Sequence, residues 1–286
     1  MLDVRKLRLL CDLERLGTIA AVAQARCYTA SAVSQQLSAL EREAGVALLE
    51  RTGRRVAFTA AGQVLARHAA RVLSALEETD AALAAVRTGP AGPLRIGAFP
   101  TAVRTLLPSA LVSLGRAHPA LELMVTEVDP ADVPAALRER RLDVGLLNDY
   151  DIAPGDVDAD LDSVPLLDET VFLAVPAEVD CDSLDAAAGQ PWIMASAGTL
   201  CHEVTVRVCA GHGYTPRVRH RADDFATVLA LVGAGQGVSL VPRLAAAAPP
   251  PTVRLIALGL RRRTRIAYRR GAATHPAVAA LIAALT

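Results

Sequence analysis

Apolar side chains recur at helical spacing through the first 45 residues, in three separate groups. The pattern predicts a helix over residues 3–15, followed by two helices joined by a tight connection at 26–28. Thr18 and Thr29 stand directly before these two helices, where a hydroxyl caps free backbone amides, and Gly45 marks the end of the last one. The side chains expected to face inward are Leu7, Leu10, Leu13, Ile19, Val22, Ala23, Val33, Leu37 and Leu40.

The outer face of the third helix is small, polar and almost uncharged. It carries Ser31, Ser34, Gln35 and Ser38, whereas many solvated helix faces carry Lys and Glu. Serine and glutamine suit a surface that lies close to base edges, because their side chains can hydrogen-bond to them. The stretch therefore predicts a helix-turn-helix whose second helix enters the major groove. An ordinary helical hairpin with a polar face is the alternative.

Two short strands flank Thr52-Gly53 in the segment VALLERTGRRVAFT, which predicts a β-hairpin. Arg51, Arg54 and Arg55 cluster at its tip. A basic hairpin beside a helix-turn-helix is a wing that can reach phosphates or the minor groove. Three solvated arginines on a surface turn would give the same pattern.

Thr59 caps a long helix that should run to about Arg87. Its apolar positions step by four and three over about three heptads, as in a helix that pairs with another helix. These positions are Leu65, Ala69, Val72, Leu76, Thr79, Leu83 and Val86. We favour pairing over docking on the chain's own core, because the preceding module is too small to cover so long a helix.

Residues 88–93 are rich in Gly and Pro, which predicts a hinge. Strands and helices then alternate, which predicts an open α/β sheet with ligands bound beyond the carboxyl ends of the strands. We expect strands at 94–98, 121–127, 142–147, 164–175 and 192–195, and near 218, 238, 255 and 266. We expect helices at 101–116, 130–139, 199–210, 223–234 and 276–285.

A chain of 286 residues with 52% hydrophobic residues is long enough for two or three domains with sizeable cores. The net charge of zero hides an asymmetry. Residues 1–62 hold nine basic and six acidic side chains, a net of +3, and residues 89–286 hold eighteen and twenty-one, a net of −3. The sign change fits an N-terminal module for a polyanion and a C-terminal module for another ligand.

Five cysteines, an odd number without a CxxC pair, indicate reduced thiols and a cytoplasmic protein. The first residues form a charged amphipathic helix rather than a secretory signal. The uncharged stretch 225–241 approaches membrane-spanning length, but it contains Gly233, Gly235 and Gly237 and ends at Pro242. We interpret it as a helix, a turn and a strand, and we expect no membrane partner.

The common catalytic motifs are either incomplete or absent in this sequence. His202-Glu203 begins a zinc-protease pattern, but Val206 stands where the second histidine is needed. The glycines at 233–237 follow a predicted helix rather than a strand, so a dinucleotide loop is disfavoured. Neither GxSxG nor a P-loop occurs. We expect no enzyme, no metal and no cofactor.

The segments AVSQQLSALEREAGVALLERTGRRVAFTAAGQVL and GAGQGVSLVP make the chain resemble LysR-type transcriptional regulators along essentially its whole length. The resemblance implies a winged helix-turn-helix at 1–62, a dimerising linker helix at 63–88 and an effector-binding domain at 89–286. That α/β domain would have two lobes, as in periplasmic solute-binding proteins, at about 94–163 with 267–286 and at about 164–266. It implies a dimer or tetramer that binds double-stranded DNA under the control of a small molecule.

On this resemblance the DNA-binding residues are Thr29, Ala30, Ser31, Ser34, Gln35, Gln36, Ser38, Arg51, Arg54 and Arg55. The chain departs from the family at three of its positions. Arg26 replaces an aliphatic residue, so the first helix of the pair can end differently. Ala30 offers only an apolar contact, and Gln35 replaces a frequent arginine, so the operator of a relative cannot be transferred.

The candidate effector residues lie where a predicted strand ends and a helix begins, because the first backbone amides of a helix have no partner within it. They are Pro100, Thr101, Asn148, Ser196, Thr199, Arg221, Asp223 and Phe225. Each alone could be a routine cap or loop residue. Together they favour a small anionic or zwitterionic metabolite, with Arg221 as the countercharge.

Two alternatives remain. Peroxide-sensing members of the family use two cysteines in the region of Cys201 and Cys209, but eight residues along one helix span roughly 12 Å, whereas a disulfide needs Cα atoms within about 7 Å. Two small buried residues is the preferred interpretation. A plain solute-binding protein would need export and would not need residues 1–88.

Overall fold

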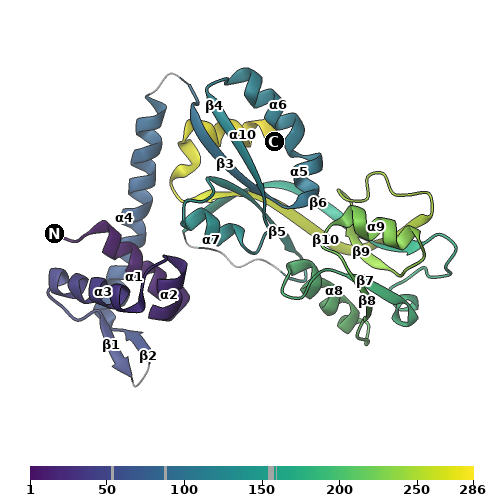
Figure 1. Cartoon of the computed structure of the whole chain (residues 1–286), viewed down its shortest axis with the longest axis horizontal. Coiled ribbons are helices and arrows are strands. Elements are labelled where there is room, and N and C mark those ends of the chain that lie inside the picture. Colours follow the sequence, from purple (N-terminus) through teal and green to yellow (C-terminus); the bar gives the residue numbers. More distant parts are fainter. Residues whose placement is uncertain (53–54, 87–88, 154–157, 159) are drawn as a thin grey trace. The chain divides into compact units, whose positions relative to one another are not determined.

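The computed structural model describes residues 1–52, 55–86, 89–153, 158 and 160–286 (Figure 1). The chain divides into two compact units. The first comprises Met1–Val86 together with Arg270–His275, and the second comprises Arg87–Arg269 together with Pro276–Thr286. Each unit has its own buried apolar core, so each is described by itself.

Besides a 3₁₀ turn at Ala272–Thr274, the described residues of the first unit form four α-helices and a hairpin. They are α1 (Val4–Leu16), α2 (Ile19–Ala25), α3 (Ala30–Ala44), β1 (Leu49–Thr52), β2 (Arg55–Phe58) and α4 (Ala60–Ala85). The predicted caps are confirmed, since the side chains of Thr18, Thr29 and Thr59 accept hydrogen bonds from backbone amides at the starts of α2, α3 and α4. Gly45 adopts a left-handed conformation directly after α3, which a residue without Cβ tolerates at little cost.

The apolar stripes predicted from the sequence form the core of this unit. Leu10, Leu13, Val22, Val33 and Leu40 are fully buried, and the first turns of α4 pack against the same cluster. The helical spacing therefore positions α3 through its apolar side and leaves its polar side outward.

The second unit is built on a six-stranded mixed sheet with the order β4-β3-β5-β10-β6-β9. Its strands are β3 (Gly92–Ala98), β4 (Leu121–Glu127), β5 (Val144–Tyr150), β6 (Leu161–Pro176), β9 (Ser239–Pro242) and β10 (Val253–Arg269). β3 runs parallel to β4 and β5, whereas β10 is antiparallel to β5 and β6. A separate parallel pair joins β7 (Pro191–Met194) and β8 (Arg217–Arg221).

The helices of the second unit are α5 (Pro100–Thr105), α6 (Leu107–Ala117), α7 (Val133–Arg138), α8 (Leu200–Gly211), α9 (Phe225–Gly233) and α10 (Pro276–Leu285), with a 3₁₀ turn at Ala186–Gly189. The single helix predicted over 101–116 is wrong, because the chain breaks at Leu106 into α5 and α6. Pro108 has no amide to donate back along the helix, which explains the break. Within the described residues, no helix combines the length and apolar character needed to cross a bilayer.

Two long strands run through the whole second unit. Residues 262–268 of β10 pair with β5, and residues 253–257 pair with the far half of β6, which in turn pairs with β9. The sequence predicted separate strands near 255 and 266, and the structure joins them. We call β3–β5 with α5, α6, α7 and α10 lobe I, and β7–β9 with α8 and α9 lobe II; β6 and β10 belong to both (Figure 1).

Candidate DNA-reading surface and effector site

The outer face of α3 is polar and accessible, as its pattern predicts. Ser31, Gln35, Gln36 and Ser38 are exposed, and Ser34 is half-buried. Thr29 and Ala30 are exposed at the start of the helix, where free amides point outward. The candidate side chains of α3 therefore share one surface.

The turn between α2 and α3 is closed by an unusual residue. The backbone of Cys27 has φ of +54°, in the left-handed region that glycine or asparagine usually occupies at this position. The amide of Tyr28 donates to the carbonyl of Ala23 at 2.9 Å across the turn, as in a Schellman motif. α2 ends at Ala25, and Arg26 caps it.

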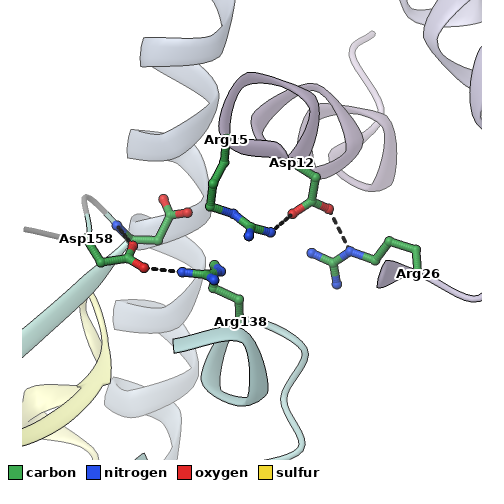
Figure 2. Close-up of polar contacts among 6 residues, drawn as sticks. Asp12, Arg15, Arg26, Arg138 and Asp158 are labelled. Atoms are coloured by element: carbon green, nitrogen blue, oxygen red, sulfur yellow. Dashed lines mark hydrogen bonds and ion pairs between the residues drawn. The ribbon is translucent and has the colours of Figure 1, made fainter. Parts of the chain in front are cut away.

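Arg26 contributes to a buried ionic cluster that sequence reasoning missed (Figure 2). Asp12 on α1 is only 4% exposed. Its carboxylate accepts hydrogen bonds from Arg26 Nε at 2.6 Å and from Arg15 Nη2 at 3.1 Å. The cluster ties the end of α2 to α1. The available signal was an aspartate within the apolar run LLCDL, which no helical face explains.

The wing is held against the end of α3. β1 and β2 pair from Leu49 with Phe58 to Thr52 with Arg55. Glu41 Oε1 accepts from the amides of Leu48 and Leu49, each at 3.0 Å. Of the predicted wing arginines, Arg54 lies outside the described residues, and Arg51 and Arg55 are described only as strand residues.

The apolar positions predicted to form one seam along α4 fall into two groups, one buried and one exposed. Leu65 and Ala69 pack into the core of the first unit, so they are not available to a partner helix. Further along, Val72, Leu76 and Leu83 are 44%, 38% and 65% exposed. The second half of the helix thus carries an apolar stripe that its own unit leaves exposed.

A narrow hollow, here called the inner cavity, lies in the second unit between β6, β9, α8 and the start of α9. Its polar lining comes from Tyr150, Cys201, Thr205, Asp223 and Ser239, and the rest of its wall is mainly apolar. With about 20 Å³ it holds about one or two water molecules. A larger ligand requires the cavity to widen.

Four predicted effector residues, Ser196, Thr199, Arg221 and Asp223, lie close together, and Asp223 lines this cavity. The amide and the hydroxyl of Ser196 both donate to the carboxylate of Asp223, each at 2.7 Å. Thr199 caps α8 and donates its hydroxyl to the Ser196 carbonyl at 2.8 Å. Arg221 reaches the carbonyl of Ala195 at 3.4 Å. The loop before α8 therefore already binds a carboxylate, one that belongs to the chain itself.

The other predicted effector residues lie in different surroundings from one another. Phe225 lines the inner cavity, and buried Thr101 lines a second hollow. Asn148 accepts a hydrogen bond from Thr264 at 2.9 Å and lines neither hollow. Pro100 is the first residue of α5 and also lines neither. Elsewhere in lobe I, Arg138 forms an ion pair with Asp158 (Figure 2).

A buried cation, also missed from the sequence, lies close to the inner cavity. Arg262 on β10 is 1% exposed, and its Nε donates to Glu169 Oε1 at 2.8 Å. The guanidinium carbon lies 5.1 Å from the ring centroid of Phe99. Glu169 Oε2 accepts from the amide of Leu244 at 2.6 Å. In the sequence, Arg262 is hidden in the run RRRTR, where solvated arginines were the natural interpretation.

The two cysteines of α8 have different surroundings. Cys201 is half-buried, with its Sγ 3.7 Å from the Tyr150 hydroxyl, and Cys209 is buried. Burial raises the pKa of both thiols, and for Cys201 the nearby Arg262 guanidinium opposes this only in part. Burial also raises the pKa of Tyr150 well above its usual value. These groups are therefore uncharged near neutral pH.

Comparison with known proteins matches both units. The bacterial regulatory helix-turn-helix protein, lysR family, matches residues 4–63, and the LysR substrate binding domain matches residues 87–286. The chain is similar to the DNA-binding transcriptional dual regulator OxyR of Escherichia coli (strain K12), with 31% identity over 218 residues, or 74% of this chain and 70% of that protein. It is 33% identical over 221 residues to a "probable hydrogen peroxide-inducible genes activator" of Mycobacterium avium, again 75% and 70% of the two chains.

Solved structures extend the similarity to the full length. A cysteine-to-serine mutant of OxyR from Corynebacterium glutamicum with bound hydrogen peroxide has a TM-score of 0.58 and 25% identity, covering 100% of this chain and 92% of that one. CbnR, a LysR family transcriptional regulator, has a TM-score of 0.54 at 21% identity, covering 100% of each chain, and shares the fold.

Members of this family are transcription regulators rather than enzymes; they bind DNA and small-molecule effectors, and they form oligomers. The substrate-binding match alone spans more than half of the chain, and the helix-turn-helix match covers most of the first unit. The chain therefore belongs to the LysR family and is a DNA-binding transcription regulator with an effector-binding domain.

Proposed function

We propose that this regulator reads its operator with the polar face of α3 and with the wing, and that a small zwitterionic metabolite at the inner cavity controls the reading. The observation that carries the effector proposal is the Ser196–Asp223 pair in the loop before α8, with its two hydrogen bonds of 2.7 Å. The Ser196 amide and hydroxyl and the Asp223 carboxylate meet there, and Arg221 donates to the carbonyl of the preceding residue, Ala195.

The charges around the pair favour a zwitterion over a plain anion. An anionic ligand at the Ser196 amide would have to displace the Asp223 carboxylate and then remain beside it, where like charges repel. A zwitterion places its carboxylate on the Ser196 amide and on Arg221, and its ammonium on Asp223. Both charges of the ligand are then paired, whereas a plain anion would lie beside the Asp223 carboxylate without a compensating positive charge of its own.

A stability screen on the full-length chain tests the effector proposal. Amino acids are compared with the corresponding carboxylic acids and amines. A ligand at about 100-fold its Kd stabilises the native state by roughly 2.7 kcal/mol. We expect amino acids alone to raise the melting temperature, Asp223→Asn to abolish the shift and Asp132→Asn, at an exposed aspartate of lobe I, to preserve it. Shifts produced equally by carboxylic acids would refute the zwitterion.

On the DNA side, we propose that Ser31, Ser34 and Gln35 contact base edges and that Arg54 contacts phosphate. Gln35→Ala should cost about 1–3 kcal/mol at the best operator and relax preference at one base pair. Arg54→Ala should weaken binding to all sequences and reduce its salt dependence. Genome-wide DNA capture, followed by titration of the captured sites with both variants, measures these effects. A Gln35→Ala variant with unchanged preference would remove α3 from the reading surface.

We further propose that the exposed stripe on the second half of α4 pairs with the same stripe of a second copy. Val72, Leu76 and Leu83 are large, apolar and separated by helical steps, which suits a two-helix seam. Such a dimer presents two copies of α3 to successive turns of one operator.

Oxidation of Cys201 is a second candidate input. Its thiol borders a cavity about as large as one or two water molecules, and several similar proteins are described as hydrogen peroxide-inducible genes activators. The Cys201 thiol would lose its proton, its sulfur would attack one peroxide oxygen, the O–O bond would break, and the leaving hydroxide would take up the proton, so that a sulfenic acid and water form. Trapping by dimedone, detected by mass spectrometry, tests this. An adduct at Cys201 that is absent in Cys201→Ser supports it, and an unmodified Cys201 refutes it.

A further inference from the structure

A short segment near the end of the chain, Arg270–His275, belongs to the first unit although the residues on both sides of it belong to the second. We call this segment the strap. It follows Arg269 at the end of β10 and precedes Pro276 at the start of α10, and its 3₁₀ turn packs on α4. The chain therefore returns to the first unit after it has built almost all of the second.

The strap approaches the backbone of α4 at Gly271, so closely that no side chain fits there. A Cβ added to Gly271 would lie 2.6 Å from the carbonyl oxygen of Ser74, 2.9 Å from Glu78 Cγ and 3.2 Å from the amide nitrogen of Glu78. Gly271 also has φ of +88°, a conformation that residues with a Cβ rarely adopt. The contact and the backbone conformation thus each require glycine at this position. The next residue, Ala272, is only 4% exposed.

The strap lies on the side of α4 opposite to its exposed apolar stripe. Ser74 and Glu78 are each two residues away from Leu76, and two residues turn an α-helix by roughly 200°. Ala81 follows Ser74 by seven residues and shares its face; it is 1% exposed, whereas Leu83 in the stripe is 65% exposed. The second half of α4 therefore has one buried face and one exposed face.

We propose that the strap is a second fastening of the effector domain to α4, and that the strap, rather than the predicted hinge at 88–93 alone, holds the two units of one chain together. Domains joined only by a linker rich in Gly and Pro move independently by default. The strap adds an attachment at Ser74 and Glu78, and the helix ends at Val86. Glu78 and Val86 are eight residues apart, or roughly 12 Å along the helix.

Both ends of the chain segment that builds most of the effector domain are then attached to the same half of α4. This fastening needs neither an effector nor a second copy of the chain, so it can be tested independently of the proposed function.

Cutting the chain at the predicted hinge tests the strap directly. A protease recognition sequence is inserted between Pro90 and Ala91 of the full-length chain, and the folded protein is cut there. We expect the fragment with residues 1–90 to co-elute with the remainder in size-exclusion chromatography, because the strap of the larger fragment still packs on α4. Gly271→Ala should raise the dissociation constant between the fragments at least about tenfold, measured by a dilution series, since the added Cβ overpacks the contact.

Gly213→Ala is the matched control. Gly213 also has a positive φ, +80°, but a Cβ added there would meet no atom within 4 Å. The variant therefore introduces similar backbone strain without the contact, and it should leave the co-elution unchanged.

Two outcomes of the cut would refute the strap. Wild-type fragments that separate would show that the strap does not hold the units, and this result needs no variant. Fragments that remain as tightly bound in Gly271→Ala as in wild type would show that other contacts hold them. Hydrogen exchange in the uncut chain is a second measurement. Amides of residues 75–82 should exchange faster in Gly271→Ala and those of α1 should keep their wild-type rates, and unchanged exchange at 75–82 would contradict the proposal.

Discussion

Removal of Arg26 from the buried cluster tests how strongly that cluster holds the end of α2 against α1 in the first unit. Arg26→Ala removes the 2.6 Å hydrogen bond to Asp12 and leaves Arg15 as the remaining partner at 3.1 Å. A hydrogen bond to a charged group contributes about 1.5–3 kcal/mol. The Arg26 side chain is 18% exposed and regains some hydration in the opened state, so we expect a loss of about 1.5–2 kcal/mol. Asp12→Ala breaks both bonds and should cost about 3 kcal/mol.

Hydrogen exchange of α1 and α2 amides, followed by mass spectrometry, measures these losses in the full chain. Each 1.4 kcal/mol is a factor of about ten, so exchange should accelerate about 10–30-fold in Arg26→Ala. Trp192, the only tryptophan of the chain, is buried in the second unit and provides an internal control, because its fluorescence should not change. The double-mutant cycle of Asp12 and Arg26 isolates their coupling. Coupling below about 0.5 kcal/mol would show that the cluster is only surface electrostatics.

Three further results are expected. Gly62→Ala should strongly destabilise the first unit, because the added Cβ would lie 2.0 Å from the backbone oxygen of Leu48, and thermal unfolding measures the loss; an unchanged melting temperature would contradict it. Leu76→Glu places a charge in the exposed stripe of α4 and should give monomers in sedimentation experiments, so an unchanged dimer would locate the interface elsewhere. Iodoacetamide at neutral pH should modify exposed Cys27 faster than Cys201, whose pKa is raised by burial; equal rates by mass spectrometry would refute the closed environment of Cys201.

The sequence predicted best where a local pattern decides the structure. Helical spacing and three threonine caps located α2, α3 and α4 within one or two residues, because side-chain burial and capping both act within one turn of helix. The segment 225–242 was interpreted correctly as a helix, a turn and a strand for the same reason. The break at Leu106 was missed although Pro108 announces it, since the apolar spacing continues across the break.

The interior of the effector domain was less predictable. Arg262 and Glu169 are separated by 93 residues, so nothing in either local sequence reports their pairing. The Ser196–Asp223 bond likewise joins two loops from different parts of the chain. The structure brings Ser196, Thr199 and Asp223 together but not Pro100 and Asn148, and the sequence did not predict the pairing, because a partner depends on strand order and register rather than on spacing.

The two paired strands that run through both lobes determine the kind of motion available to the effector domain. Lobes joined only by short loops can rotate as rigid bodies about those loops. Here β6 (161–176) and β10 (253–269) instead form one continuous pair of strands that belongs to both lobes. Their ladder is irregular between Ala257 and Arg261, and irregular ladders are where strands bend. The irregular stretch separates the half of β10 that pairs with β5 from the half that pairs only with β6, so it is the place in the ribbon where the ladder restrains a bend least.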